Sequence, residues 1–172
     1  MKVLCVIDMQ KDFIDGALGT VEAQKIVEPL AKFIEENRDE YYIVATRDTH
    51  GENYMETNEG RHLPVPHCIK GTEGWQINPI IAKAIGNAPV YDKPNFGISA
   101  EEWKKFLYPA DVTEIVLTGL CTDICVVSNA LALKTAYPEI PVKVMKELCA
   151  GVSPASHEAA LTTMGMCQVE II

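Results

Sequence analysis

Apolar and polar residues follow one another along the chain in blocks that predict strands and helices in turn. Apolar runs rich in Val and Ile are typical of buried strands, and apolar residues at helical spacing indicate the helices that cover them. We expect strands at residues 2–7, 41–46, 88–91, 115–118, 142–145 and 167–171. We expect helices at residues 21–37, 77–85, 99–107, 122–137 and 154–164. A long polar stretch, residues 47–76, is expected to be a loop.

This alternation predicts an α/β fold with three layers, α/β/α, around a central, mostly parallel, Rossmann-like sheet. No repeat or linker divides the sequence, so we expect residues 1–172 to form a single domain. Ser99, followed three residues later by Glu102, predicts a capping box at one helix start. In parallel sheets of this kind, ligands bind beyond the carboxyl ends of the strands.

Composition narrows the possible partners. The 172-residue chain is 48% hydrophobic and 23% charged, which is typical of an ordinary globular protein. Its net charge of −9, with no basic stretch, argues against nucleic acid or an anionic membrane as a partner. We see no signal peptide and no apolar run of the roughly 20 residues that would span a bilayer. We therefore expect a cytoplasmic protein whose six cysteines are reduced.

The segment Gly119–Val126 places a cysteine, Cys125, where a predicted strand gives way to a predicted helix. The free N–H groups at a helix start favour a thiolate over a thiol. A thiolate is a nucleophile, so this segment indicates an enzyme that works through a covalent thioester.

Other reactive side chains are predicted at the same edge of the sheet. Asp8 follows the first strand and Lys93 follows the third. Each of these residues alone has an ordinary explanation: Asp8 as a turn cap, Lys93 as a surface lysine, Cys125 as a small buried side chain. Together, Lys93 would lower the pKa of the thiol and Asp8 would act as general base and then general acid. Backbone N–H groups around Cys121 and Cys125 would hold an oxyanion.

A metal site is predicted in the loop after the second strand. Asp48 and His50 lie two residues apart, which points both side chains the same way in an extended segment. His67 lies further along the loop. One carboxylate and two imidazoles suit a divalent metal, Zn²⁺ first, with Fe²⁺ or Mn²⁺ as alternatives.

Five segments in the same order resemble the isochorismatase-like cysteine hydrolase family, and its nicotinamidase branch most of all. They are residues 8–13, 48–50, 66–72, 91–97 and 119–126. The resemblance implies a catalytic triad of Asp8, Lys93 and Cys125, with the N–H groups of Cys121 and Cys125 as the oxyanion hole. It also implies a cis peptide bond between Leu120 and Cys121, and a homo-oligomer.

The resemblance also bears on the metal and the substrate. It supports Asp48, His50 and His67 as ligands, with Glu59 favoured as the fourth over Glu56 and His62. In nicotinamidases the metal ligates the pyridine nitrogen of a small amide. Phe13, Phe96 and Leu120 are the candidates for the substrate pocket.

We therefore expect a metal-dependent amidohydrolase that converts nicotinamide to nicotinate and ammonia. One feature departs from the family: residues 63–67 contain no aromatic residue, whereas many nicotinamidases have one there that stacks on the ring. An amidase for a carbamoyl or ureido compound is the alternative within the family. A redox or metal-binding protein that uses Cys121 and Cys125, and a catalytically inactive binding protein, are the alternatives of other classes.

Overall fold

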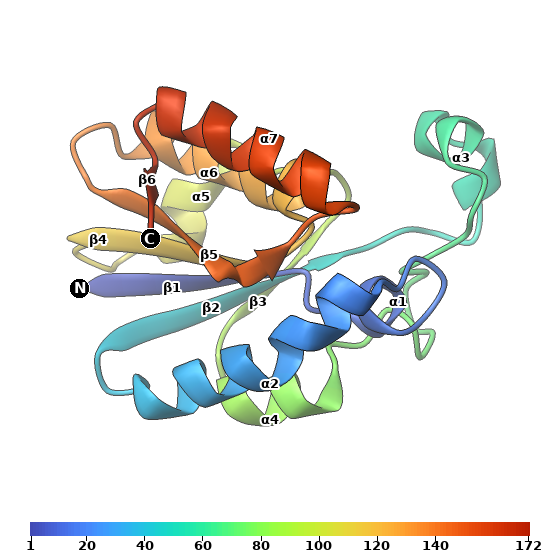
Figure 1. Ribbon diagram of the computed structural model, residues 1–172, viewed down its shortest axis with the longest axis horizontal. Helices are drawn as coiled ribbons and strands as arrows, with labels where there is room; N and C mark the ends of the chain where they lie inside the picture. The colour runs from blue at the N-terminus through green and yellow to red at the C-terminus, as the bar shows by residue number, and fades with distance from the viewer.

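A parallel sheet of six strands runs through the middle of the molecule (Figure 1). In the computed structural model, which describes residues 1–172, the strand order is β3-β2-β1-β4-β5-β6 and every pairing is parallel. The strands are β1 (Lys2–Ile7), β2 (Tyr41–Asp48), β3 (Val90–Lys93), β4 (Glu114–Leu120), β5 (Val142–Ala150) and β6 (Glu170–Ile171). The predicted α/β class is confirmed.

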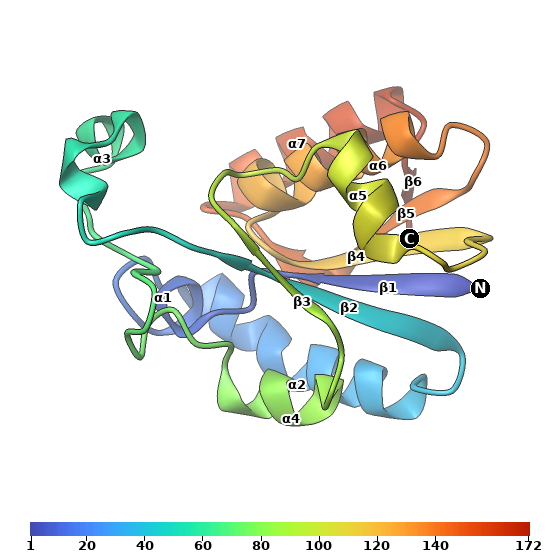
Figure 2. The same cartoon turned by 180° about the vertical axis from the view of Figure 1, so that it is seen from behind.

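Helices cover both faces of this sheet and make the three layers (Figures 1 and 2). On one face lie α2 (Val21–Glu36) and α4 (Pro79–Ile85); on the other lie α5 (Ala100–Leu107), α6 (Val127–Ala136) and α7 (Pro154–Met166). Each face of the sheet buries its own apolar cluster against its helices. None of the helices combines the length and the apolar character needed to cross a membrane.

Most predicted elements are present, with different ends. β2 and β5 extend further than expected, β3 is shifted toward the C-terminus, and the last strand is only Glu170–Ile171. The capping box of Ser99 and Glu102 is present. The helix predicted at 122–137 is divided into a π-helical turn, η2 (Thr122–Val126), and α6. The ends of β2 and β3 matter because they place Asp48 and Lys93, two residues with reactive side chains, as the last residues of these strands.

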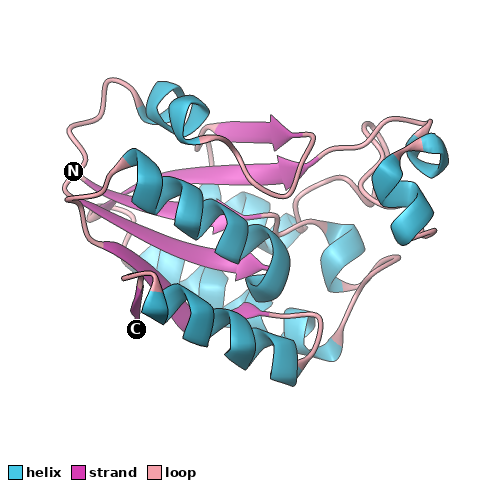
Figure 3. Ribbon diagram, turned by 90° about the horizontal axis from the view of Figure 1, so that it is seen from above, coloured by secondary structure: helices cyan, strands magenta, loops and turns pink.

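The predicted loop projects from the carboxyl edge of the sheet, opposite the end where both termini lie (Figure 3). It contains two short helices that the sequence analysis did not anticipate, η1 (Tyr54–Glu56) and α3 (Asn58–His62). A third short helix, α1 (Lys11–Ile14), follows β1. The projecting loop therefore brings its own side chains to the edge where the strands end.

Gly119 allows β4 to lie close against β1 at this edge. The residue has a φ of 110°, and a Cβ there would approach the carbonyl oxygen of Ile7 to 2.1 Å. Any side chain would collide with the neighbouring backbone, and the positive φ itself favours glycine. The ends of β1 and β4 thus sit side by side, at the point where the strand order reverses and where such sheets bind ligands.

Candidate active site

Three strand ends bring Asp8, Lys93 and Cys125 into one buried cluster. Asp8 directly follows β1, Lys93 is the last residue of β3, and Cys125 lies in the turn after β4. The Nζ atom of Lys93 is 2.7 Å from Oδ2 of Asp8 and 3.4 Å from Sγ of Cys125. Sheet register also pairs Lys93 with Asp48 at the end of β2, where Nζ is 3.4 Å from Oδ1. Lys93 therefore stands between the thiol and two carboxylates.

The pKa of the Cys125 thiol differs from the sequence-based expectation. Burial and the Asp8 carboxylate raise this pKa well above its ordinary value, and the Lys93 ammonium opposes them without prevailing. The prediction of a thiolate at a helix start was wrong for the free protein, because burial outweighs the favourable charge. The thiol consequently needs a base. Burial also raises the pKa of Asp8, whose carboxylate acts on the pKa of the Cys125 thiol and makes it the candidate base.

Two buried polar residues that the sequence analysis missed hold Asp8 and Asp48 in place, the first through its carboxylate and N–H and the second through its backbone. The Thr46 hydroxyl donates to Oδ1 of Asp8 at 2.7 Å and accepts from the Asp8 N–H at 3.2 Å. The Gln10 side chain accepts from the Asp48 N–H at 2.7 Å and donates to the Asp48 carbonyl at 2.8 Å. Their only signal in the sequence was a polar residue next to an apolar run. Both residues fix the ends of β1 and β2 against each other.

The backbone beside Cys125 contains the predicted cis peptide bond between Leu120 and Cys121. The N–H of Cys121 donates to no other backbone group, while its carbonyl accepts from Ile124 and Val126 at 3.1 and 3.0 Å. This N–H is therefore free to donate to an oxygen atom of a bound molecule. Cys121 and Cys125 form no disulfide, since all six cysteines are free.

Four side chains, one from the end of β2 and three from the projecting loop, form a group suited to a metal ion: Asp48, His50, Glu59 and His67. One ligand atom from each lies within 4.8 Å of the others. The four separations between a histidine nitrogen and a carboxylate oxygen run from 2.8 Å, for His50 and Asp48, to 3.8 Å, for His67 and Glu59. Donors about 2.0–2.2 Å from a tetrahedral Zn²⁺ would lie roughly 3.3 Å apart, so the group has the required size.

The state of the histidines agrees with this chemistry. Nδ1 of His67 lies 2.8 Å from the Val65 carbonyl, which only accepts, so this nitrogen carries the hydrogen and Nε2 keeps its lone pair. Nε2 of His50 is buried and has no hydrogen-bond partner, although Asp48 lies near it. Burial would raise the pKa of Asp48, but the two histidines and Lys93 hold it well below its usual range. The residues present fit a divalent metal.

The three candidates for a fourth ligand are separated by the geometry. Oε1 of Glu59 is 3.6 Å from Nε2 of His50, inside the group. Nδ1 of His62 instead lies 2.8 Å from the carbonyl of Asn58. Neither His62 nor Glu56 belongs to the group of four ligand side chains. The structure thus brings Glu59 to the group, as the sequence analysis favoured.

A cavity of about 170 Å³ opens beside these groups. Its walls include Phe13 and Phe96, two of the three residues expected there. The third, Leu120, does not line the cavity, because its side chain is 1% exposed and packs in the hydrophobic core. The remaining lining residues are Leu18, Asp48, Glu59, His62, Leu63, His67, Cys121, Ile124 and Cys125.

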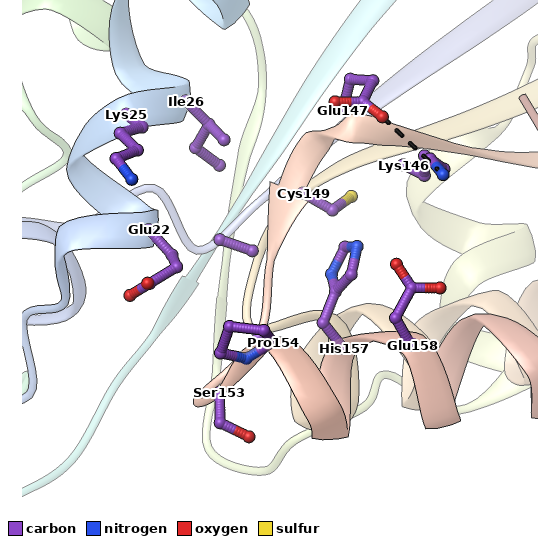
Figure 4. A pocket seen from close by; sticks show the side chains of 12 residues that line it. Glu22, Lys25, Ile26, Lys146, Glu147, Cys149, Ser153, Pro154, His157 and Glu158 are labelled. Carbon is purple, nitrogen blue, oxygen red and sulfur yellow. Dashed lines mark ion pairs between the residues drawn. The ribbon is translucent and has the colours of Figure 1, made fainter.

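A separate cavity of about 410 Å³ lies between α2, the end of β5 and the start of α7 (Figure 4). Cys149 and His157 both line it, and the charged residues around them carry both signs. Nδ1 of His157 is 2.8 Å from Oγ1 of Thr122, in the turn that carries Cys125. His157 therefore supports that turn from a position outside the cluster of Asp8, Lys93 and Cys125.

Comparison with known proteins agrees with the fold and the site. A family model described as the isochorismatase domain matches residues 2–172. The nicotinamidase/pyrazinamidase of Mycobacterium tuberculosis is 26% identical, with 100% of this chain and 98% of that protein aligned. The pyrazinamidase/nicotinamidase structure from Streptococcus mutans is 30% identical with a TM-score of 0.85, and covers 100% of both chains. Pyrazinamidase of Pyrococcus horikoshii in complex with zinc is 29% identical, with a TM-score of 0.81, and covers 99% of this chain and 98% of that one.

Proposed function

The chain belongs to the isochorismatase family, and we propose that it hydrolyses nicotinamide to nicotinate and ammonia through a thioester on Cys125. It is a hydrolase of the nicotinamidase type, which acts on an amide C–N bond. The observation that carries the proposal is the position of Lys93. Its ammonium group touches the thiol of Cys125 and the carboxylate of Asp8 beside a cavity whose walls include Phe13 and Phe96.

In the first half of the reaction, Asp8 takes the proton from the Cys125 thiol, and the sulfur attacks the amide carbon. The oxygen of the tetrahedral intermediate accepts hydrogen bonds from the N–H groups of Cys121 and Cys125. The intermediate then collapses as Asp8 returns its proton to the departing nitrogen, which leaves as ammonia. Lys93 keeps its proton throughout, since three negative or electron-rich groups surround it and raise its pKa despite burial.

In the second half, Asp8 accepts a proton from a water molecule, whose oxygen attacks the thioester carbon. The C–S bond breaks, the sulfur regains the proton, and the acid leaves. A carboxyl group with a raised pKa suits both of these proton transfers near neutral pH. Asp8 therefore serves as base and as acid once in each half of the cycle.

We assign the metal ligands to Asp48, His50, Glu59 and His67, and zinc is our first choice of ion because two imidazoles and two carboxylates suit it. A divalent ion there would supply a Lewis-acid site for the lone pair of a ring nitrogen. Phe13, from α1, and Phe96, from the segment after β3, line the same cavity and would enclose the ring. Cys125 lines the same cavity, so a ring held there would have its carboxamide within reach of the thiol.

The test is ammonia release by purified protein from nicotinamide, pyrazinamide and an N-carbamoyl amine, with metal content measured on the same sample. We expect nicotinamide to be hydrolysed and Cys125→Ala to be inactive. Hydrolysis of the N-carbamoyl amine alone would favour the second candidate function, which is supported by Leu63 standing in the cavity wall instead of an aromatic residue. We also expect a homo-oligomer, which the native mass would report.

A further inference from the structure

Asn129 uses every hydrogen-bonding group of its side chain to join the nucleophile to the cavity wall. It is fully buried on α6, one turn after Cys125. Its Nδ2 donates to the carbonyls of Cys125 at 2.8 Å and Phe96 at 3.1 Å. Its Oδ1 accepts from the N–H of Ile98 at 2.9 Å and from Nε1 of Trp103 at 3.1 Å. A primary amide offers two donors and two acceptor positions, so the side chain is completely satisfied.

The segment that Asn129 holds is the one that follows Lys93 and carries Phe96. Phe96 lines the cavity and is 46% exposed. Few neighbours pack against its side chain, so the position of the ring depends mainly on the backbone that carries it. Gly97 lies so close to α6 that an added Cβ would approach Cβ of Ser128 to 3.2 Å. Nζ of Lys93 donates to the Asn95 carbonyl in the same segment, at 3.1 Å. Residues 93–98 are thus docked on the helix that begins beside the nucleophile.

We propose that Asn129 is a positioning residue for the substrate: it fixes the Phe96 wall relative to the sulfur of Cys125. Two of its bonds go to backbone groups on either side of Gly97, and one goes to the carbonyl of the nucleophile itself. Asn129 is thus the side chain that bonds both the wall segment and the backbone of the nucleophile, alongside the contacts of Gly97 and Lys93. The identity of the substrate as a ring-bearing amide rests on the proposed function.

Asn129→Thr separates the two halves of this network. A threonine hydroxyl bonds the carbonyl four residues earlier in a helix, so the Cys125 contact is kept. The hydroxyl is one bond shorter than the amide group and does not reach residues 96–98. Asn129→Ser serves the same purpose if the threonine variant does not fold. Trp103→Phe is the matched control. It removes the hydrogen bond from Nε1 of Trp103 to Oδ1 of Asn129 and leaves the bonds to residues 96–98 in place.

Two measurements report on the position of the Phe96 wall relative to Cys125. The first is kcat and KM for nicotinamide. The second is the ratio of the rates at which N-benzyliodoacetamide and iodoacetamide alkylate Cys125, measured on its peptide by mass spectrometry. We expect Asn129→Thr to raise KM about tenfold with kcat within about twofold, since a displaced apolar wall weakens ring binding. We expect the alkylation ratio to fall about tenfold as well.

Trp103→Phe should also lower Tm but leave KM and the alkylation ratio as in the wild type. Unchanged KM and ratio in Asn129→Thr, or equal changes in Trp103→Phe, would overturn the proposal. If the wild-type protein does not hydrolyse nicotinamide, the proposed function fails. The alkylation ratio then decides the role of Asn129 alone, because iodoacetamides need no amidase activity.

Discussion

Replacing Lys93 with methionine would leave a buried carboxylate without its counter-charge. Lys93 is 1% exposed and Asp8 is 0% exposed, with 2.7 Å between Nζ and Oδ2. Methionine keeps most of the apolar length of lysine and removes the charged Nζ with its hydrogen bonds, including the one to the Asn95 carbonyl. Breaking a buried pair from one side costs about 3–5 kcal/mol, whereas an exposed pair contributes up to about 1 kcal/mol. We expect Lys93→Met to lower the free energy of unfolding by about 3–5 kcal/mol at pH 7.

The charge left on Asp8 should account for most of this loss. In Asp8→Asn with Lys93→Met, both groups are neutral, so the double variant should be more stable than Lys93→Met alone. Asp8→Asn alone should be milder, because Lys93 keeps its contact with Asp48 at 3.4 Å. The interaction between the two substitutions is the quantity that isolates the pair.

The loss should also depend on pH, with a definite sign. Burial raises the pKa of folded Asp8 above its unfolded value, and Lys93 opposes that rise, so Lys93→Met raises it further. Folded Asp8 therefore binds its proton more readily than unfolded Asp8, and its penalty disappears as the pH falls through the folded pKa. The difference between wild type and Lys93→Met should shrink on acidification from pH 7.

Urea unfolding followed by tryptophan fluorescence measures these differences, after dialysis against a chelator so that metal binding does not contribute. A loss under about 1 kcal/mol in Lys93→Met would place the pair in the weak class of exposed ion pairs. A double variant no more stable than Lys93→Met would show that the loss comes from packing, and would refute the electrostatic reasoning.

Two further predictions concern the thiol and the metal. Alkylation of Cys125 by iodoacetamide at pH 8 should be faster in Asp8→Asn and slower in Lys93→Met than in the wild type, because the carboxylate raises the pKa of the thiol and the ammonium lowers it; the reverse order contradicts the geometry. His67→Ala removes a ligand, so affinity for Zn²⁺, measured by calorimetry, should fall by about tenfold or more. His62→Ala removes no ligand and should change the affinity by less than about twofold. Equal losses of affinity in the two variants would count against the ligand set.

The positions of the reactive residues could be predicted from the sequence because each lies at the end of an apolar run. The carboxyl ends of parallel strands meet at one edge, so Asp8, Lys93 and Asp48 had to approach one another once the runs were identified as strands. The same reasoning placed Cys125 beside them after β4. Their catalytic and ligand roles stay predictions until the variants are assayed.

The supporting residues could not be predicted in this way. Gln10, Thr46 and Asn129 find their partners in segments distant along the chain, so no local pattern reveals what they bind. Leu120 is a candidate for the substrate pocket in the sequence, but its side chain packs in the hydrophobic core, which only the fold reveals. The pKa of Cys125 was misjudged for a related reason: burial depends on the whole fold, whereas the sequence displays only the neighbouring charges.

The most direct test of the account is a search for the thioester itself. The protein is mixed with nicotinamide, quenched rapidly in acid, and the peptide that carries Cys125 is examined by mass spectrometry. We expect a nicotinoyl group on the sulfur of Cys125, lost on longer reaction as nicotinate forms, and neither adduct nor ammonia from Cys125→Ala. Ammonia release by Cys125→Ala at the wild-type rate would contradict the central claim that the thiol is the nucleophile.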